Sequence, residues 1–192
     1  VGSLRTLTAV RPRAGAVIWI ASAVCYVIVE ALAATAIGDY HYARDYISDL
    51  GRPDLSPRAA LMNAAFVVQA VAFPLGALLV ASSRKALPFL VFAIVNGVGN
   101  VLVALVHSGS GAPAHVIGAV LAIVGGNAAI LAYGIVTRSR ASLLVGGIGL
   151  ATFALFALGL EPVGAWERVS VYAIYGWQAL TGTLLLRRAC AD

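Results

Sequence analysis

The stretch Asp39–Gly51, with the sequence DYHYARDYISDLG, is the one densely polar and aromatic segment of an otherwise apolar chain. Read as a helix that begins at Asp39 and ends before Gly51, it carries two stripes of side chains at three-and-four spacing. The first stripe holds His41, Asp45, Ser48 and Asp49, and the second holds Tyr42, Tyr46 and Leu50. Imidazole and carboxylate groups on one face are used in general acid–base catalysis and in binding divalent metal ions, so this segment is the first candidate for a site.

The other two histidines, His107 and His115, are expected close to this segment. They are eight residues apart and flank a short connection between two apolar runs, so their imidazoles should be near neighbours. Together with His41 and the nearby carboxylates, they have the ligand types of a site for zinc or another divalent ion. No fixed motif such as H-E-x-x-H is present. The expected cofactor is therefore none, and metal ligation by His41, His107 and His115 is kept as an alternative.

Polar residues inside the apolar runs form a second group of candidates. Glu30 lies about two turns from the end of its run, beneath Asp39–Gly51. We expect it to be protonated or to pair with an arginine or histidine from that side. Asn96, Asn100 and His107 lie within about 40° of one another on a helical wheel and can form one polar stripe. Hydrogen bonding between helices stays open as a structural role for the two asparagines.

The elements that must position these residues are membrane-spanning helices. Hydrophobic residues make up 61% of the 192 positions and charged residues only 11%, whereas a soluble domain has about 25% charged residues. The apolar residues come in runs of about 20, the length that a helix needs to cross a bilayer. The net charge of +5 comes mostly from arginines in the connections. These arginines therefore indicate membrane orientation rather than nucleic-acid binding.

Six helical spans are predicted, at residues 14–37, 57–82, 87–107, 115–137, 142–160 and 169–186. Because the connections are short, neighbouring helices must be antiparallel, which predicts an all-α, single-domain, six-helix transmembrane bundle over residues 1–192. We expect the first span to be a retained helix rather than a signal peptide, since it is long and contains Glu30. Small residues at packing intervals should allow close helix contact in span four, at Gly118, Ala122 and Gly126.

The distribution of basic residues predicts the orientation in the membrane. Nine fall on one side: Arg5, Arg11, Arg13, Arg84, Lys85, Arg138, Arg140, Arg187 and Arg188. Four fall on the other: Arg44, Arg52, Arg58 and Arg168. By the positive-inside rule, both termini are cytoplasmic and residues 39–56 are extracytoplasmic.

Three motifs resemble a known family: YISDLG, the SPRAALMN that follows it, and HVIGAVLAIVGGN, which begins at His115. Together they are similar to the prokaryotic six-helix membrane family named domain of unknown function 998. The resemblance implies six helices with both termini inside, in a prokaryotic inner or plasma membrane, and no assigned activity. It marks as family-type positions Ser48, Asp49, Leu50, Gly51, Asn63 and His115. The chain is also faintly similar to DRAM-like six-helix membrane proteins, some linked to lipid or GPI-anchor handling, which favours lipids as ligands.

Three functions fit these residues. In the first, a polar cavity open to the outer leaflet, with residues 39–51 as its lid, binds a lipid or other amphiphile through Glu30, His41, Tyr46, Ser48, Asn96, Asn100 and Tyr175, beside His107 and His115. In the second, the site is a lipid-directed hydrolase or transferase with the catalytic candidates His107, His115, Asp45 and Asp49. In the third, YISDLG caps a structural or assembly protein without a ligand. Membrane lipids are the expected partners, nucleic acid is not, and a homo-oligomer or a membrane protein partner stays open.

Overall fold

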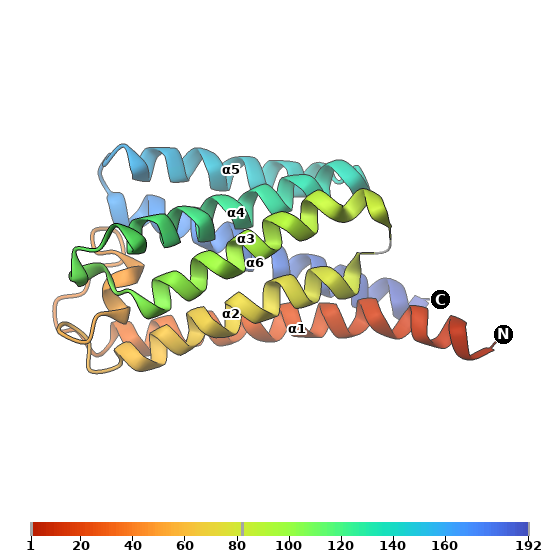
Figure 1. Cartoon of the computed structure of the whole chain (residues 1–192), viewed down its shortest axis with the longest axis horizontal. Coiled ribbons are helices and arrows are strands. Elements are labelled where there is room, and N and C mark those ends of the chain that lie inside the picture. The colour runs from red at the N-terminus through yellow and green to blue at the C-terminus, as the bar shows by residue number, and fades with distance from the viewer. Residues whose placement is uncertain (1, 82, 192) are drawn as a thin grey trace.

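The computed structural model describes the backbone of residues 2–81 and 83–191 and the side chains of residues 11–81 and 83–188. Its long helices are α1 (Gly2–Ala34), α2 (Ala59–Val80), α3 (Leu87–Leu105), α4 (Pro113–Thr137), α5 (Arg140–Ala157) and α6 (Val163–Ala191). Short 3-10 helices lie in the connections: η1 (Ile47–Gly51), η2 (Arg84–Ala86) and η3 (Ser108–Ser110). The long helices run side by side. Residues 39–56 lie at one end of the bundle, and the start of α1 and the end of α6 lie at the other (Figure 1).

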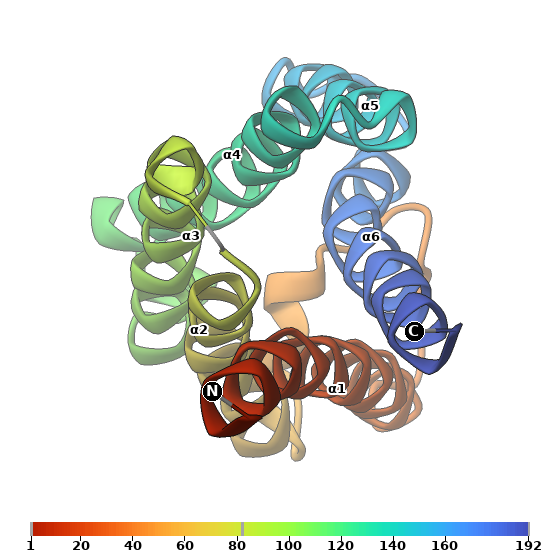
Figure 2. The ribbon, with the colours of Figure 1, turned by 90° about the vertical axis from the view of Figure 1, so that its right-hand side faces the viewer.

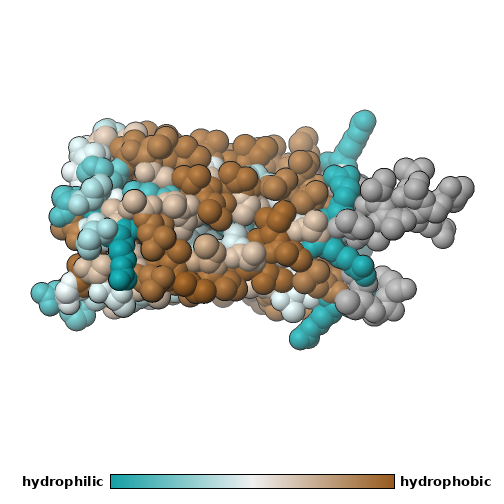
Figure 3. Space-filling model, turned by 90° about the horizontal axis from the view of Figure 1, so that it is seen from below, coloured by the Kyte–Doolittle hydropathy of each residue, from teal (hydrophilic) through white to brown (hydrophobic). Residues whose placement is uncertain are grey.

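The six long helices form a ring in chain order. Each helix packs against the next one along the chain, and α6 closes the ring against α1 (Figure 2). All six have the length and hydropathy to cross a membrane, within Arg11–Ala34, Ala59–Val80, Arg84–Leu105, Pro113–Thr137, Arg140–Ala157 and Val163–Arg188. Figure 3 shows the matching surface, a hydrophobic belt with hydrophilic residues on both sides of it. The predicted all-α six-helix bundle is confirmed.

The predicted spans match these helices, but some of their ends differ. The first helix ends at Ala34 rather than at residue 37, and the second begins at Ala59 rather than at residue 57. The first helix also begins earlier, at Gly2 rather than at residue 14, and α6 begins at Val163, six residues before the predicted start. The charged residues of this stretch favour a solvated connection on sequence alone. In the structure, Glu167 and Arg168 lie within α6 and are buried inside the bundle.

Glycines allow α3 and α4 to pack closely. A Cβ on Gly125 would lie 2.8 Å from the backbone nitrogen of Asn96, and a Cβ on Gly118 would lie 2.7 Å from the Cβ of Leu102. A Cβ on Gly126 would collide with the side chain of Ile174 in α6. The predicted packing role of these small residues is therefore confirmed, and the helix backbones approach each other because side chains are absent there.

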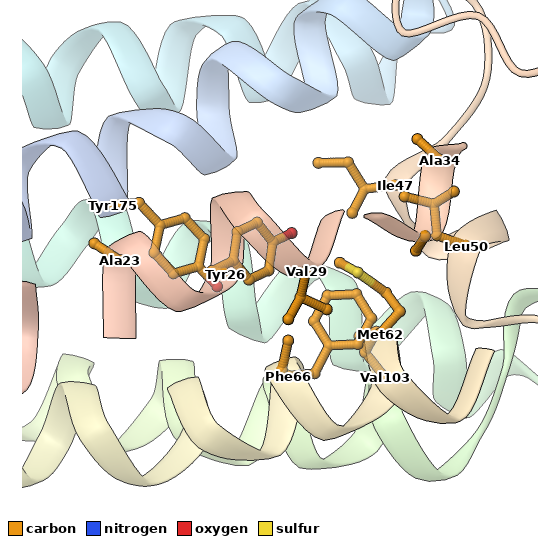
Figure 4. Packing of buried hydrophobic residues seen from close by; sticks show 12 residues of the cluster. Ala23, Tyr26, Val29, Ala34, Ile47, Leu50, Met62, Phe66, Val103 and Tyr175 are labelled. Carbon is orange, nitrogen blue, oxygen red and sulfur yellow. The ribbon is translucent and has the colours of Figure 1, made fainter. Parts of the chain in front are cut away.

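The core has two parts along the bundle axis. Toward the start of α1, five aromatic rings fill the inside of the helical ring, with neighbouring centroids 5.0–6.5 Å apart: Trp19, Phe73, Phe89, Tyr133 and Trp177. Toward residues 39–56, the core includes Tyr26, Val29, Met62, Phe66, Val103 and Tyr175, with Ile47 and Leu50 from the α1–α2 connection (Figure 4). The polar side chains described below lie beside this second part.

The prediction that Asp39–Gly51 forms one helix is wrong. Only Ile47–Gly51 is helical, as the 3-10 helix η1, and the residues before it form turns and irregular structure. The carboxylate of Asp45 accepts a hydrogen bond from the backbone N–H of His41 at 2.7 Å, which closes a turn where a helix would otherwise continue. The two stripes expected from helical spacing therefore do not exist.

Candidate functional site

We call residues 39–56 the cap. Two of its side chains, Ile47 and Leu50, are 2% and 0% exposed and belong to the core cluster at this end of the ring. Asn63 of α2 donates a hydrogen bond from its amide nitrogen to the carbonyl of Gly51 at 3.0 Å, so it holds the cap rather than another helix. The cap is therefore a folded plug over one end of the bundle, not a loose connection.

A buried ion pair joins α1 to α6 beneath the cap. The Nε of Arg168 lies 3.2 Å from Oε1 of Glu30, and the two side chains are 6% and 1% exposed. Of the two expectations for Glu30, protonation or pairing with an arginine or histidine from this side, the pair with Arg168 confirms the second. The other carboxylate oxygen of Glu30, Oε2, is buried without a hydrogen-bond partner.

The same guanidinium also binds the cap. Its Nη1 donates hydrogen bonds to the carbonyls of Tyr42 at 2.5 Å and Asp45 at 2.7 Å, and its Nη2 donates to the hydroxyl of Tyr40. The rings of Tyr40 and Tyr42 lie with their centroids 5.3 and 4.7 Å from Cζ of Arg168, within the range of cation–π attraction. Arg168 thus links three parts of the molecule: its own helix α6, helix α1 through Glu30, and the cap.

Tyr40 takes part in this network as a neutral hydroxyl. Burial raises the pKa of Tyr40 far above its ordinary value, and this effect exceeds the opposite effect of the nearby Arg168 guanidinium. The hydroxyl donates a hydrogen bond to the carbonyl of Tyr46 at 2.9 Å while it accepts one from Arg168. The Tyr40 hydroxyl therefore connects the cap backbone at Tyr46 to the guanidinium of Arg168.

The two aspartates proposed as catalytic, Asp45 and Asp49, form contacts within the cap and its surroundings. Arg44 Nε lies 3.0 Å from Oδ1 of Asp45, and hydrogen bonds from Arg44 and then from the backbone hold the pKa of Asp45 below its usual value. Asp49 accepts a hydrogen bond from the hydroxyl of Ser108 at 3.2 Å and lies 3.6 Å from Nη1 of Arg52. Both carboxylates thus stabilise the cap surface.

A cavity of about 50 Å³ lies below the cap. The cap, α2, α3 and α6 contribute the polar part of its lining. These polar residues are Ser48, Gln69, Asn96, Asn100 and Glu167, and the phenol rings of Tyr26 and Tyr175 lie beside them. Apolar side chains of α2, α3, α4 and α6 complete the wall. The volume suits a small polar group or a few water molecules.

The polar side chains of the cavity are only partly satisfied. Oε2 of Glu167 accepts a hydrogen bond from the backbone N–H of Ile47 at 2.7 Å. Asn96 donates from Nδ2 to a backbone carbonyl of α4 at 2.6 Å, and Gln69 donates from Nε2 to Oε1 of Gln178 at 3.1 Å. The remaining amide oxygens, Oδ1 of Asn96 and Oε1 of Gln69, are buried without a partner. Two acceptor groups of the cavity lining, the amide oxygens of Asn96 and Gln69, are therefore left for a hydrogen-bond donor.

The structure brings some of the predicted ligand-binding residues together and leaves others apart. Ser48, Asn96, Asn100 and Tyr175 line the cavity, and Glu30 lies in the ion pair beneath the cap. His41 is exposed on the cap. Tyr46 is 40% exposed, and its ring centroid lies 5.9 Å from that of Phe156 in α5. His41 and Tyr46 are therefore not lining residues, because the cap turns outward before η1 begins.

The histidines are likewise outside the cavity lining. His115 donates from Nδ1 to the carbonyl of Val106 at 2.6 Å and so satisfies a free carbonyl just past the end of α3. In the part of the chain that the structure describes, no three His, Cys, Asp or Glu side chains lie close enough together to hold a metal ion. His41, His107 and His115 are thus not gathered, because the first is held on the cap and the other two at the α3–α4 connection.

Glu167 was missed as a site residue because sequence reasoning assigned it to a connection. Its spacing does hold a signal. Glu167, Val171, Ile174 and Gln178 recur at intervals of three and four residues, and the first three line the cavity while Gln178 is fully buried. Extending the helical wheel of the last span back to Val163 would have placed Glu167 on this inward face.

A second hollow of about 480 Å³ faces outward between α1 and α6, and we call it the α1–α6 groove. It is almost wholly apolar and is lined by Ala23, Val24, Val27, Ile28, Tyr172, Tyr175, Gly176 and Ala179. Tyr175 also lines the polar cavity, and its ring stacks on that of Tyr26 with centroids 3.9 Å apart (Figure 4). The Tyr26–Tyr175 stack is therefore the wall between the inner cavity and the groove.

The ring of long apolar helices and its hydrophobic belt define a polytopic helical membrane protein. The family described as "Protein of unknown function (DUF998)" matches residues 19–184. The chain therefore belongs to this family, as its YISDLG, SPRAALMN and HVIGAVLAIVGGN motifs predicted. Comparisons with curated proteins and with solved structures found no match.

Proposed function

We propose that this protein binds a lipid or another amphiphile beneath the cap. The polar part of the ligand occupies the cavity, and its apolar chain passes the Tyr26–Tyr175 wall into the α1–α6 groove. The cap is the lid over the polar end. In this proposal both termini are cytoplasmic and the cap is extracytoplasmic, which the excess of basic residues at the opposite end supports, so the ligand comes from the outer leaflet of the plasma membrane.

The position of Tyr175 carries this proposal. Its side chain is 5% exposed and lines two adjoining hollows, one polar and one apolar. An amphiphile in a bilayer needs this order, with a polar site inside the protein and an apolar path that opens to the acyl chains. The movement that this proposal requires is a change in the side-chain rotamer of Tyr175, the residue that lines both hollows, of about 50 and 480 Å³.

Gly176 offers a direct test of the apolar path. It lies in the groove, and a Cβ built on it would meet nothing within 4 Å, so a leucine there fills the groove without disturbing the bundle. Gly147 of α5 is a matched control, because its Cβ would also meet nothing within 4 Å but lies outside the groove. Both variants add the same side chain to a membrane-facing helix surface.

Mass spectrometry of the purified protein measures the amphiphile bound per chain. Gly176→Leu is expected to lower the bound amount at least about tenfold, which corresponds to a loss of about 1.4 kcal/mol of binding free energy. Gly147→Leu is expected to keep the wild-type amount. A Gly176→Leu protein with undiminished amphiphile would contradict the proposal.

The same measurement separates binding from the other functions considered. A structural protein without a ligand would carry no stoichiometric amphiphile in the wild-type form. The residues put forward for chemistry on a lipid do not form a catalytic pair at the cavity: Asp45 and Asp49 contact arginines, and no imidazole is hydrogen-bonded to a carboxylate among the described side chains. Binding is therefore the function that the described contacts support best.

A further inference from the structure

Three side chains around the cavity, Asn96, Gln69 and Glu167, present oxygens that can only accept hydrogen bonds. The side chains of Asn96 and Gln69 are 1% and 2% exposed, and their amide oxygens have no partner, while their nitrogens are already engaged. Glu167, 6% exposed, adds a carboxylate of which Oε2 takes one backbone N–H. A ligand group that satisfies this lining must donate hydrogen bonds, because a buried acceptor without a donor is destabilising.

The buried charges leave one negative charge in excess. Within the described ranges, three charged side chains are buried: Glu30, Glu167 and Arg168. Arg168 is paired with Glu30 at 3.2 Å, and none of the described basic groups forms an ion pair with Glu167. An unpaired carboxylate inside a membrane-spanning bundle is unfavourable unless it is neutralised by a proton or by a cation. The cavity beside Glu167 has room for such a cation.

We infer that the cavity binds a protonated amine, as the headgroup of the amphiphile; this rests on the function proposed above. An ammonium group that carries N–H bonds can donate to the oxygens of Asn96 and Gln69 and balance the charge of Glu167. The rings of Tyr26 and Tyr175 add aromatic faces that attract a cation. The volume of about 50 Å³ suits a headgroup of this size.

The same lining discriminates against a quaternary ammonium. A trimethylated nitrogen has the charge but no N–H, so it would leave the oxygens of Asn96 and Gln69 unpaired. Its three methyl groups also need more space than an –NH₃⁺ group. Loss of hydrogen bonds to buried polar groups is a stronger source of discrimination than a change of one methylene in an apolar pocket.

The experiment compares phosphatidylethanolamine with phosphatidylcholine of identical acyl chains, added to the delipidated protein and measured by native mass spectrometry. The wild-type protein is expected to bind phosphatidylethanolamine at least about tenfold better. Glu167→Gln keeps an oxygen for the N–H of Ile47 but removes the charge, and it is expected to reduce this preference to below about threefold. Glu161→Gln, an exposed acid just before α6, is the matched control and keeps the wild-type preference.

A second arm uses free ethanolamine and tetramethylammonium as competitors. Displacement of bound phosphatidylethanolamine by ethanolamine, and not by tetramethylammonium, supports the amine site with a lipid as its source. Binding of ethanolamine without binding of any phospholipid also supports the amine site, but it assigns the site to a soluble amine and overturns the amphiphile proposal.

Equal binding of both phospholipids by the wild-type protein overturns the amine inference, and so does a preference that Glu167→Gln leaves unchanged. The wild-type comparison needs no variant, so the test holds even if Glu167→Gln does not fold. If the preference is absent but Gly176→Leu still removes bound lipid, the amphiphile proposal stands without the amine. If Gly176→Leu also has no effect, both fail.

Discussion

Arg168 of α6 and Glu30 of α1 form a buried ion pair with 3.2 Å between Nε and Oε1, although 138 positions separate them in the sequence. The pair lies where the first and last helices meet, so it closes the helical ring. Because the same guanidinium binds the carbonyls of Tyr42 and Asp45, ring closure and cap placement depend on one side chain. The cavity lies below that cap.

Replacing Arg168 by methionine is expected to lower the free energy of unfolding by about 3–5 kcal/mol, because it leaves the carboxylate of Glu30 buried without a counter-charge. Reversible unfolding in detergent measures this. Arg44→Met removes a cap arginine whose side chain is 62% exposed and should leave the stability close to wild type. Equal stability of the two variants would show that the pair does not hold the ring. Adding Glu30→Gln to Arg168→Met is expected to recover part of the loss.

Truncating the plug residue Leu50 to alanine is expected to cost about 2–5 kcal/mol, since this side chain is 0% exposed and its removal leaves a cavity in the core. The cap should then open more often, so limited proteolysis within residues 39–56 should become faster. Leu55→Ala is the control, because Leu55 belongs to the same cap but is 45% exposed. Cleavage at the wild-type rate in Leu50→Ala would mean that the cap is not held by its apolar side chains.

The lowered pKa of Asp45 predicts how the cap responds to pH. A carboxyl group with a folded-state pKa below its unfolded value stabilises the fold above the unfolded value of about 3.9, and this contribution is lost as the pH falls through the folded pKa. Hydrogen-exchange protection of the His41 amide, corrected for intrinsic rates, should therefore stay constant from about pH 5 to 8 and fall below about pH 4. Asp45→Asn should lack this acid step. Loss of His41 amide protection between pH 5 and 7 would contradict this prediction, because it would mean that a group other than Asp45 controls the pH response of the cap.

The close approach of α3 and α4 predicts a cost for adding one methyl group. Gly125→Ala places a Cβ 2.8 Å from the backbone nitrogen of Asn96, so the helices must separate, and we expect a loss of about 1–3 kcal/mol. Gly147→Ala meets nothing within 4 Å and should be neutral or slightly stabilising because alanine favours the helix. Thermal unfolding of both variants measures the difference. An equal melting temperature would contradict the packing described for α3 and α4.

Much of the fold could be predicted from the sequence, because a bilayer requires about 20 apolar residues for each helix and hydropathy reveals them directly. The same physical argument predicted a partner for Glu30, since a charged group in an apolar span needs neutralisation. Ser48, Asn96, Asn100 and Tyr175, which were expected to belong to one site, line the same cavity, because the cap, α3 and α6 face one another across the inside of the ring. Their role in binding stays a prediction.

The conformation of the cap and the start of α6 could not be predicted, because tertiary contacts determine them. The spacing of His41 and Asp45 fits a helix, but their actual hydrogen bond closes a turn. Glu167 and Arg168 look like residues of a solvated connection until Glu30 and the cap carbonyls are known to surround the guanidinium.

An experimental structure of the protein in a lipid bilayer, at a resolution that distinguishes lipids from water, tests the central claim most directly. We predict density for a polar headgroup within hydrogen-bonding distance of Glu167, continuous with an acyl chain that passes Tyr175 into the α1–α6 groove. A cavity that holds only water, with lipid in the groove no better ordered than lipid over α5, would contradict it.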